Sequence, residues 1–249
     1  MDNTSIARQF HEDGFIVVPG FVDSNRLREI AQQVDQYIAQ VVPGLSPGDV
    51  YFEDAPSRAI KSLFRMHAHD PRFRELAEDP SLIGLMQAIF PQGEVICYDV
   101  GFFGKAARDG SVTPPHQDNG FTHWNPPLVL KASLAIDDAT AQNGVMICQK
   151  GSHHLGVLPH QASGVAGFSQ TLQSPVDTEA HPEVEIRMRP GDLALHHCDT
   201  VHRSGPNRTD RSRRMLSFVF RSSLAQPDPK HSRAVAEEVQ RLHRAGARP

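Results

Sequence analysis

The first 90 residues combine helical and extended patterns. We expect a helix over 5–13, ended by Gly14, and then a short apolar strand over 15–18. A longer helix, capped at Asp23, is expected over 24–40. Its apolar side chains recur three or four residues apart, at Leu27, Ile30, Val34, Tyr37 and Ile38. This stripe predicts packing against a core rather than a surface for a partner.

Two further segments of the chain lack clear periodicity. Residues 42–56 contain three prolines and two glycines, which predicts a loop, and residues 164–181 form a polar insertion. Long segments of this kind in compact domains are often lids, so we expect both to be mobile. Residues 71–90, by contrast, favour a helix with a break near Asp79-Pro80.

Residues 95–222 consist mostly of short apolar runs between turns. This pattern is typical of the antiparallel strands of a jelly roll. We expect one domain over 1–249, with a helical N-terminal part over about 1–90, a jelly-roll core over about 95–222 and a C-terminal amphipathic helix over about 231–245. A chain of 249 residues is long enough to bury a large core in one unit.

Composition excludes several classes of protein. The net charge of −4 argues against nucleic acid as the main partner. No apolar stretch approaches the ~20 residues that span a membrane, and the N-terminus lacks the basic and apolar regions of a signal peptide. Three cysteines, an odd number, do not suggest a disulfide framework. We therefore expect a cytoplasmic protein that acts on a small molecule, without a nucleic-acid or membrane partner.

The tripeptide His116-Gln117-Asp118, with His202 far downstream, offers two imidazoles and one carboxylate. This set is the facial triad of non-haem Fe(II) oxygenases, although the same ligands can also hold catalytic zinc. In an extended strand His116 and Asp118 project from the same face and Gln117 points away. His202, 84 residues after Asp118, must come from a distant strand, which a barrel of antiparallel strands can provide.

An arginine follows the second histidine at a spacing that can place both on neighbouring strands. Arg213 lies 11 residues after His202, enough for a strand, a turn and the start of the next antiparallel strand. A guanidinium there can bind a carboxylate through two parallel hydrogen bonds. The adjacent Arg214 falls on the opposite face of that strand, because successive side chains alternate.

Four segments of the chain belong together: FHEDGFIVVPGF (10–21), HQD (116–118), IDDATAQNG (136–144) with GSH (151–153), and HRSGPN (202–207) with Arg213. In this order they resemble the phytanoyl-CoA dioxygenase family of Fe(II)/2-oxoglutarate oxygenases. Lys150 stands where the family usually has proline. Each segment by itself is weak evidence for the family, but the ordered set covers nearly the whole chain.

The resemblance implies a double-stranded β-helix, a jelly-roll core with flanking helices. It also implies Fe(2+), 2-oxoglutarate as co-substrate and O2. Iron would be bound by His116, Asp118 and His202. The co-substrate would be bound by Arg213, with Ser204, Lys61 and Tyr98 as further contacts.

Three residues are candidates for the substrate wall. The segment that leaves the metal site contains Asn119 and Trp124; the alternative for Trp124 is packing under the barrel rim. His196 and His197 precede His202 on what we expect to be one strand, so one of them must point inward. We take His197 as the substrate contact, with a hydrogen-bonded core histidine as the alternative.

The resemblance predicts a dioxygenase that hydroxylates an unactivated C–H bond and releases succinate and CO2. Alternatives are desaturation, epimerisation or ring chemistry with the same cofactors, and a non-catalytic barrel that binds a metal or ligand. Asp118 argues against a halogenase, which needs a small residue there, and Arg213 argues against a mere binding protein. No basic cluster for coenzyme A phosphates stands out, so we expect a small or medium metabolite as substrate.

Overall fold

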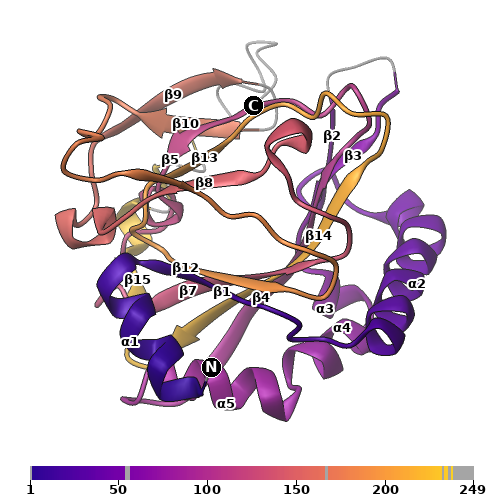
Figure 1. Ribbon diagram of the computed structural model, residues 1–249. Coiled ribbons are helices and arrows are strands. Elements are labelled where there is room, and N and C mark those ends of the chain that lie inside the picture. The colour runs from indigo at the N-terminus through magenta and orange to yellow at the C-terminus, as the bar shows by residue number, and fades with distance from the viewer. Residues whose placement is uncertain (1, 54–56, 166–167, 232, 235–236, 238–249) are drawn as a thin grey trace.

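The computed structural model describes all residues except 1, 54–56, 166–167, 232, 235–236 and 238–249. Two antiparallel sheets face each other, and helices cover the outside of the larger sheet (Figure 1). The fold is a double-stranded β-helix, or jelly roll, with flanking helices. None of the helices among the described residues is long and apolar enough to cross a membrane.

The larger sheet has the strand order β1-β12-β7-β14-β4-β3-β2. Its strands are β1 (Phe15–Val18), β12 (Leu193–His197), β7 (Val129–Ala135), β14 (Arg213–Ser222), β4 (Val95–Lys105), β3 (Ile60–Leu63) and β2 (Val50–Phe52). Alternation decides which side chains face which way. Leu216 and Phe218 of β14 face the helices, while Arg213 and Met215 of the same strand face the interior between the sheets.

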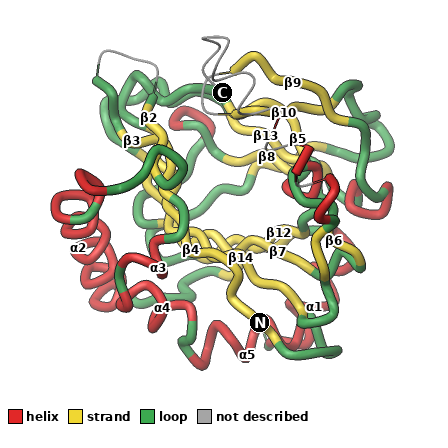
Figure 2. The backbone as a smooth tube through the Cα atoms, turned by 180° about the vertical axis from the view of Figure 1, so that it is seen from behind, coloured by secondary structure: helices red, strands yellow, loops and turns green. Residues whose placement is uncertain are grey.

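The smaller sheet has the order β11-β8-β13-β5 and lies across the interior from the larger one (Figure 2). Its strands are β11 (Glu183–Glu185), β8 (Met146–Gln149), β13 (His202–Ser204) and β5 (Thr113–His116). Two small two-stranded sheets complete the fold. They pair β9 (His160–Val165) with β10 (Phe168–Leu172) and β6 (Trp124–Asn125) with β15 (Gln226–Pro227).

The helices bury an apolar face against the larger sheet. They are α1 (Asn3–Asp13), α2 (Ser24–Gln40), α3 (Met66–His69), α4 (Pro71–Ala77) and α5 (Pro80–Ile89). In α2 the side chains of Leu27, Ile30, Val34 and Tyr37 are buried, as the stripe predicted, and Ile38 is partly buried. These residues join strand residues such as Phe220 in one core, which fixes the larger sheet as a rigid floor for the interior.

Several predicted boundaries are confirmed. Helix α1 ends at Gly14, whose φ of 83° is the left-handed conformation that glycine adopts without strain. The side chain of Asp23 accepts hydrogen bonds from the backbone amides of Asn25 and Arg26, so it caps α2. The break near Asp79-Pro80 separates α4 from α5, with Asp79 as the N-cap of α5.

The two segments predicted as irregular contain more structure than expected. The segment 42–56 was predicted as a loop, yet it forms a short 3-10 helix, Val42–Gly44, and the strand β2, which pairs with β3. The segment 164–181 contains β10 and the end of β9, a hairpin beside β5. In both cases strand pairing outweighs the local turn composition. The predicted helix over 231–245 falls mostly on residues outside those described.

Candidate metal centre

The pairing of β5 with β13 brings the two predicted histidines together. His116 and His202 are direct partners in this antiparallel pair, and their ring centroids lie 4.1 Å apart. Gln117 is extended, with φ −117° and ψ 136°, so Asp118 projects to the same side as His116. Strand β5 itself ends at His116, and Asp118 begins a 3-10 helix, Asp118–Gly120, rather than continuing the strand as expected.

Gln117 points away from the other two, as predicted. Its amide nitrogen donates to the backbone carbonyls of Gly156 and Asp199, at 2.8 and 2.7 Å. Its amide oxygen accepts from the backbone amide of Leu158 at 2.7 Å. These three bonds hold the HQD segment against two neighbouring loops, which fixes the direction of the side chains on either side.

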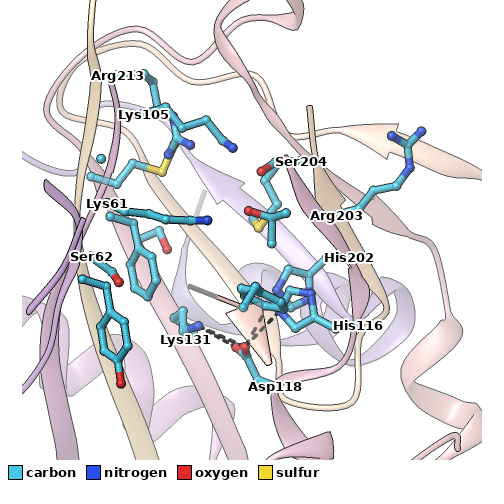
Figure 3. Close-up of a pocket in the computed structure, with 18 of the residues that line it drawn as sticks. Lys61, Ser62, Lys105, His116, Asp118, Lys131, His202, Arg203, Ser204 and Arg213 are labelled. Carbon is cyan, nitrogen blue, oxygen red and sulfur yellow. Dashed lines mark hydrogen bonds and ion pairs between the residues drawn. The ribbon is translucent and has the colours of Figure 1, made fainter. Parts of the chain in front are cut away.

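The three candidate ligands converge on one point (Figure 3). One ligand atom from each of His116, Asp118 and His202 lies within 4.8 Å of the others. The Nε2 atoms of His116 and His202 are 3.6 and 3.9 Å from Oδ1 of Asp118. Two imidazole nitrogens and a carboxylate oxygen at this spacing suit a divalent transition metal.

Backbone contacts set the tautomer of both histidines. Nδ1 of His116 donates to the carbonyl of Pro114, and Nδ1 of His202 donates to the carbonyl of Thr200, each at 2.9 Å. A carbonyl oxygen only accepts, so the proton must be on Nδ1 in both rings. The Nε2 lone pairs are therefore left for a metal, with the outer support that ligating histidines normally have.

The charges of the group also fit a metal. Burial by itself raises the pKa of Asp118, but the charge of Lys131 and the contacts with His116 and His196 outweigh it and hold the pKa well below the usual range. Burial, reinforced by the neighbouring histidines, keeps the pKa of His202 well below its ordinary value. A carboxylate and a neutral imidazole are the protonation states in which these groups bind metal.

Arg213 lies on the larger sheet, facing the same interior. Its guanidinium is buried and makes one long hydrogen bond, from Nη2 to the carbonyl of Gly144 at 3.4 Å. Its Nε is buried without a partner, and it forms no ion pair among the described residues. Burial lowers the pKa of Arg213 to about 10, so it stays charged at neutral pH. A buried cation with open donors fits the free carboxylate of a ligand.

Arg214 binds carboxylates on the other face of the strand. Its Nε and Nη2 donate to the two carboxylate oxygens of Asp137, at 2.9 and 3.0 Å, and its Nη1 donates to Asp35 at 3.0 Å. The prediction that Arg213 and Arg214 occupy opposite faces of the strand is confirmed. Strand β14 does not follow β13 in one hairpin, however, because the chain crosses from the smaller sheet to the larger one between them.

A cavity of about 420 Å³ connects the triad with Arg213. Lys61 and Ser204 line it, as expected for co-substrate contacts. Burial lowers the pKa of Lys61, and the charge of Glu53 opposes that shift. Much of the wall is aromatic, with contributions from Tyr51, Phe64, Phe103, Phe121 and Phe168. The charged groups therefore occupy specific points of a largely apolar space.

The sequence analysis did not identify Lys105 and Lys131 as cavity residues, and it chose His197 over His196 as the inward histidine. Lys105 is the direct partner of Arg213 across β4 and β14, so both side chains share a face. Burial, with the charges of Arg213 and Lys61, lowers the pKa of Lys105 to about 7. Its position depends on strand register, for which no local pattern gives a signal.

Lys131 and His196 both contact Asp118. Nζ of Lys131 lies 3.0 Å from Oδ1 and 2.9 Å from Oδ2. Nε2 of His196 donates to Oδ2 at 3.1 Å, and its Nδ1 is buried without a partner. Oδ2 is thus held by two donors, while Oδ1 faces the two ligand histidines.

The expected role of Tyr98 near the co-substrate is wrong. Its side chain is half exposed and packs edge-on against Trp124, with ring centroids 5.1 Å apart, outside the cavity. It lies at a bulge in the β4–β14 pair, where Val219 pairs with Asp99 and Phe220 with Cys97, so that Tyr98 is the extra residue.

Two of the expected substrate contacts, Asn119 and Trp124, are packing residues. Asn119 is buried and donates to Oδ1 of Asp199 at 2.7 Å, while its side-chain oxygen accepts from the backbone amide of Trp124. Trp124 is buried in a small cluster under the rim, the alternative given above. The same segment does supply a wall residue, but it is Phe121.

His197 is likewise outside the cavity, and His196 is the histidine that points inward. The ring of His197 packs near Phe10, and burial lowers its pKa to about 3. Strand β12 ends at His197, and a turn precedes β13, so His196 and His202 are not on one strand as expected.

His197, Cys198 and Asp199 form a second group of possible ligand atoms, but burial raises the pKa of Cys198 well above normal and keeps it a thiol.

The profile of the phytanoyl-CoA dioxygenase family matches residues 10–215. A rat phytanoyl-CoA dioxygenase domain-containing protein 1 is 27% identical, covering 85% of this chain and 87% of that protein. A probable alpha-ketoglutarate-dependent hypophosphite dioxygenase of Stutzerimonas stutzeri is 25% identical, covering 88% and 79%.

Solved structures of similar fold include two with ligands. The epimerase SnoN in complex with Fe3+, alpha ketoglutarate and nogalamycin RO superposes with a TM-score of 0.75 at 22% identity, covering 94% of this chain and 88% of SnoN. EctD from S. alaskensis with 2-oxoglutarate and 5-hydroxyectoine gives a TM-score of 0.73 at 21% identity, covering 89% and 77%. At these identities the likeness concerns the fold.

Proposed function

Because the chain belongs to the phytanoyl-CoA dioxygenase family and is a 2-oxoglutarate-dependent dioxygenase, we propose which of its residues hold each cofactor. His116, Asp118 and His202 bind Fe(II), and Arg213 binds the far carboxylate of 2-oxoglutarate. Ser204 and Lys61 line the same space and complete the co-substrate site, and Lys105 joins them. Tyr98 has no place in it.

One observation carries this assignment. The ligand atoms of the triad and the incompletely bonded guanidinium of Arg213 face one cavity from opposite sheets. A metal site without a carboxylate clamp would fit many hydrolases, and a buried arginine by itself would fit many binding proteins. Together they match a co-substrate that has a chelating end and a free carboxylate end.

Bound iron, 2-oxoglutarate and O2 together supply the oxidant and release succinate and CO2. The chain's own residues provide position and charge. The hydrogen bonds to Pro114 and Thr200 hold both imidazoles with Nε2 inward. Arg213 orients the co-substrate and selects one whose length spans the distance from the metal to the guanidinium. The aromatic wall excludes water from the reacting region, which limits wasteful oxidation.

For the substrate we propose a small or medium metabolite that is hydroxylated at an unactivated C–H bond. A cavity of about 420 Å³ that must also hold 2-oxoglutarate supports this size rather than a coenzyme A thioester. Desaturation, epimerisation and ring closure use the same cofactors. The mass of the product distinguishes them from hydroxylation, which adds one oxygen atom.

The test uses protein purified without oxygen, supplied with Fe(II) and 2-oxoglutarate. We expect O2 uptake and stoichiometric succinate, stimulated when the right compound from a metabolite library is added. Replacing Fe(II) by Zn(II) should stop both. Turnover of an ester or amide with Zn(II), with no succinate under Fe(II), would instead identify a hydrolase. For location we propose the cytoplasm, which the three free thiols support.

A further inference from the structure

The backbone on either side of Asp118 is held by two histidines. On one side, the amide of Gln117 donates to Nε2 of His160 at 3.1 Å. On the other side, Nε2 of His231 donates to the carbonyl of Gly120 at 2.8 Å. The candidate ligand Asp118 therefore lies between two peptide groups that are fixed from outside the loop.

Each of these contacts requires one tautomer of its ring. Nδ1 of His160 donates to the carbonyl of Leu158 at 2.8 Å, so its Nε2 carries no proton and can accept. Nε2 of His231 must carry a proton, because a carbonyl oxygen only accepts. The ring of His160 also packs on Gly120, where a Cβ atom would lie 2.6 Å from Cε1 of that ring. Only glycine allows this close approach.

His231 reaches the metal loop because the segment 225–231 runs along it. Strand β15 pairs with β6, which joins the start of this segment to the end of the loop. The amide of Asp228 then donates to the carbonyls of Thr122 and His123, at 3.2 and 3.1 Å. The carboxylate of Asp228 accepts from the amide of His231 at 3.3 Å, which orients the backbone of His231.

The ring of His231 is held by a second imidazole. It stacks on His123, with ring centroids 3.5 Å apart and an interplanar angle of 19°. Burial and the neighbouring His231 lower the pKa of His123, against the charge of Asp228, so His123 is neutral at neutral pH. His123 has a φ of 49°, a left-handed conformation that persists only where the surroundings enforce it. The stack and the bonds from the segment 225–231 enforce it here.

The same loop carries part of the cavity wall. Phe121 lines the cavity, and its ring lies 6.1 Å from that of His116. A shift of the Gly120 peptide would therefore move a candidate ligand and an aromatic wall residue together. Lys131 and His196 hold the carboxylate of Asp118, but they do not hold its backbone.

We propose that His231, through its hydrogen bond to Gly120, is a positioning residue for the metal centre. The segment 225–231 thereby becomes part of the active site, although the candidate ligands lie elsewhere. Acting with His160, His231 fixes the direction in which the backbone presents Asp118. The proposal rests on the function proposed above, in which Asp118 binds iron.

The experiment titrates the metal-free protein with Co(II) and follows its visible absorption, which reports both affinity and ligand geometry. His231→Phe keeps a ring that can stack on His123 but removes the donor, and His231→Gln keeps a donor. We expect Co(II) affinity to fall about two- to tenfold in His231→Phe, the effect of one hydrogen bond, with a changed spectrum. His231→Gln should recover much of the affinity and the spectrum.

The matched control is Lys230→Ala, which changes an exposed neighbour in the same segment. It should keep the wild-type affinity and spectrum. Circular dichroism checks that each variant is folded. If His231→Phe does not fold, His231→Leu takes its place, because leucine also lacks the donor.

Three results would overturn the proposal. Wild-type affinity in His231→Phe would show that the hydrogen bond contributes nothing to the metal centre. An equal loss in His231→Gln or in Lys230→Ala would assign the effect to the segment rather than to the donor. Asp118→Ala, measured alongside, tests the proposed function: if it binds Co(II) like the wild type, that function is wrong. If Asp118→Ala loses Co(II) and His231→Phe does not, only this inference is wrong.

Discussion

His116 and His202 are direct partners across β5 and β13, with ring centroids 4.1 Å apart. The backbone pairing therefore sets the distance between two of the three candidate ligands before any metal binds. Such a site should be preformed in the metal-free protein, and loss of one ligand should not disturb the strands that carry the others.

We expect His116→Ala, Asp118→Ala and His202→Ala each to abolish succinate formation and keep the fold. Loss of a ligand should weaken metal binding by more than the ~10–100-fold that loss of an outer-shell partner costs. Titration with Co(II), followed by its visible absorption, and circular dichroism measure the two properties. His154→Ala, at an exposed position, is the control. Near-normal activity of His202→Ala would disprove the assignment of the second histidine.

Arg213→Ala should raise the Michaelis constant for 2-oxoglutarate sharply. Truncating one partner of a buried ion pair costs roughly 3–5 kcal/mol, which corresponds to about 10²–10³-fold or more in affinity. Arg213→Lys should recover only part of this loss, because it lacks the paired donors. Arg214→Ala should leave the constant almost unchanged, since Arg214 binds Asp137 and Asp35 on the outer face. A large increase of this constant in Arg214→Ala would contradict the assignment of Arg213 as the co-substrate contact.

Binding of 2-oxoglutarate should weaken as pH rises above 7. The pKa of Lys105 is about 7 in the free protein, so its charge next to Arg213 is lost over this range. The bound dianion favours the protonated amine, and each pH unit should therefore cost up to about tenfold in affinity. Calorimetry at pH 6.5 to 8.5 with Mn(II) measures the slope. In Lys105→Met the affinity should depend much less on pH. A slope equal to that of the wild type would show that Lys105 does not cause the pH dependence.

The same lysine should affect stability. The pKa of Lys105 is lowered on folding, so between about 7 and its ordinary value of 10.5 the unfolded chain binds more protons than the folded one. The free energy of unfolding contributed by Lys105 therefore rises with pH across that window. Urea denaturation of the metal-free protein should show this rise, and Lys105→Met should lack that part of it. If the free energy of unfolding depends on pH in the same way in both proteins, the pKa of Lys105 is not lowered on folding.

His196 should position Asp118. Its Nε2 donates to Oδ2 at 3.1 Å, which leaves Oδ1 toward the ligand histidines. His196→Phe keeps the volume of the ring but removes this donor, and we expect about a 10–100-fold weaker affinity for Co(II). His196→Gln, which can still donate, should recover part of the affinity. Unchanged Co(II) binding in His196→Phe would show that Lys131 orients the carboxylate without help.

The local pattern of the chain determined much of the fold. Helix α2 with its Asp23 cap, the end of α1 at Gly14 and the break at Asp79 all depend on neighbours within a few residues, so they could be predicted. The motif His116-Gln117-Asp118 and the opposite faces of Arg213 and Arg214 follow from strand alternation. These features need only the backbone period and the chemistry of single residues.

Tertiary structure decided the rest of the site. Lys105 reaches the cavity through its register with Arg213, and Lys131 and His196 meet Asp118 from two other strands, 13 and 78 residues further along the chain. Tyr98 lies at a bulge of β4 outside the cavity, and the pairing of β12 with β7 places His196 opposite Lys131, facing inward. Such outcomes depend on pairing between remote segments, where a shift of one residue exchanges the two faces of a strand. The sequence could name the candidate metal ligands, but only the paired strands could show which charged side chains surround them.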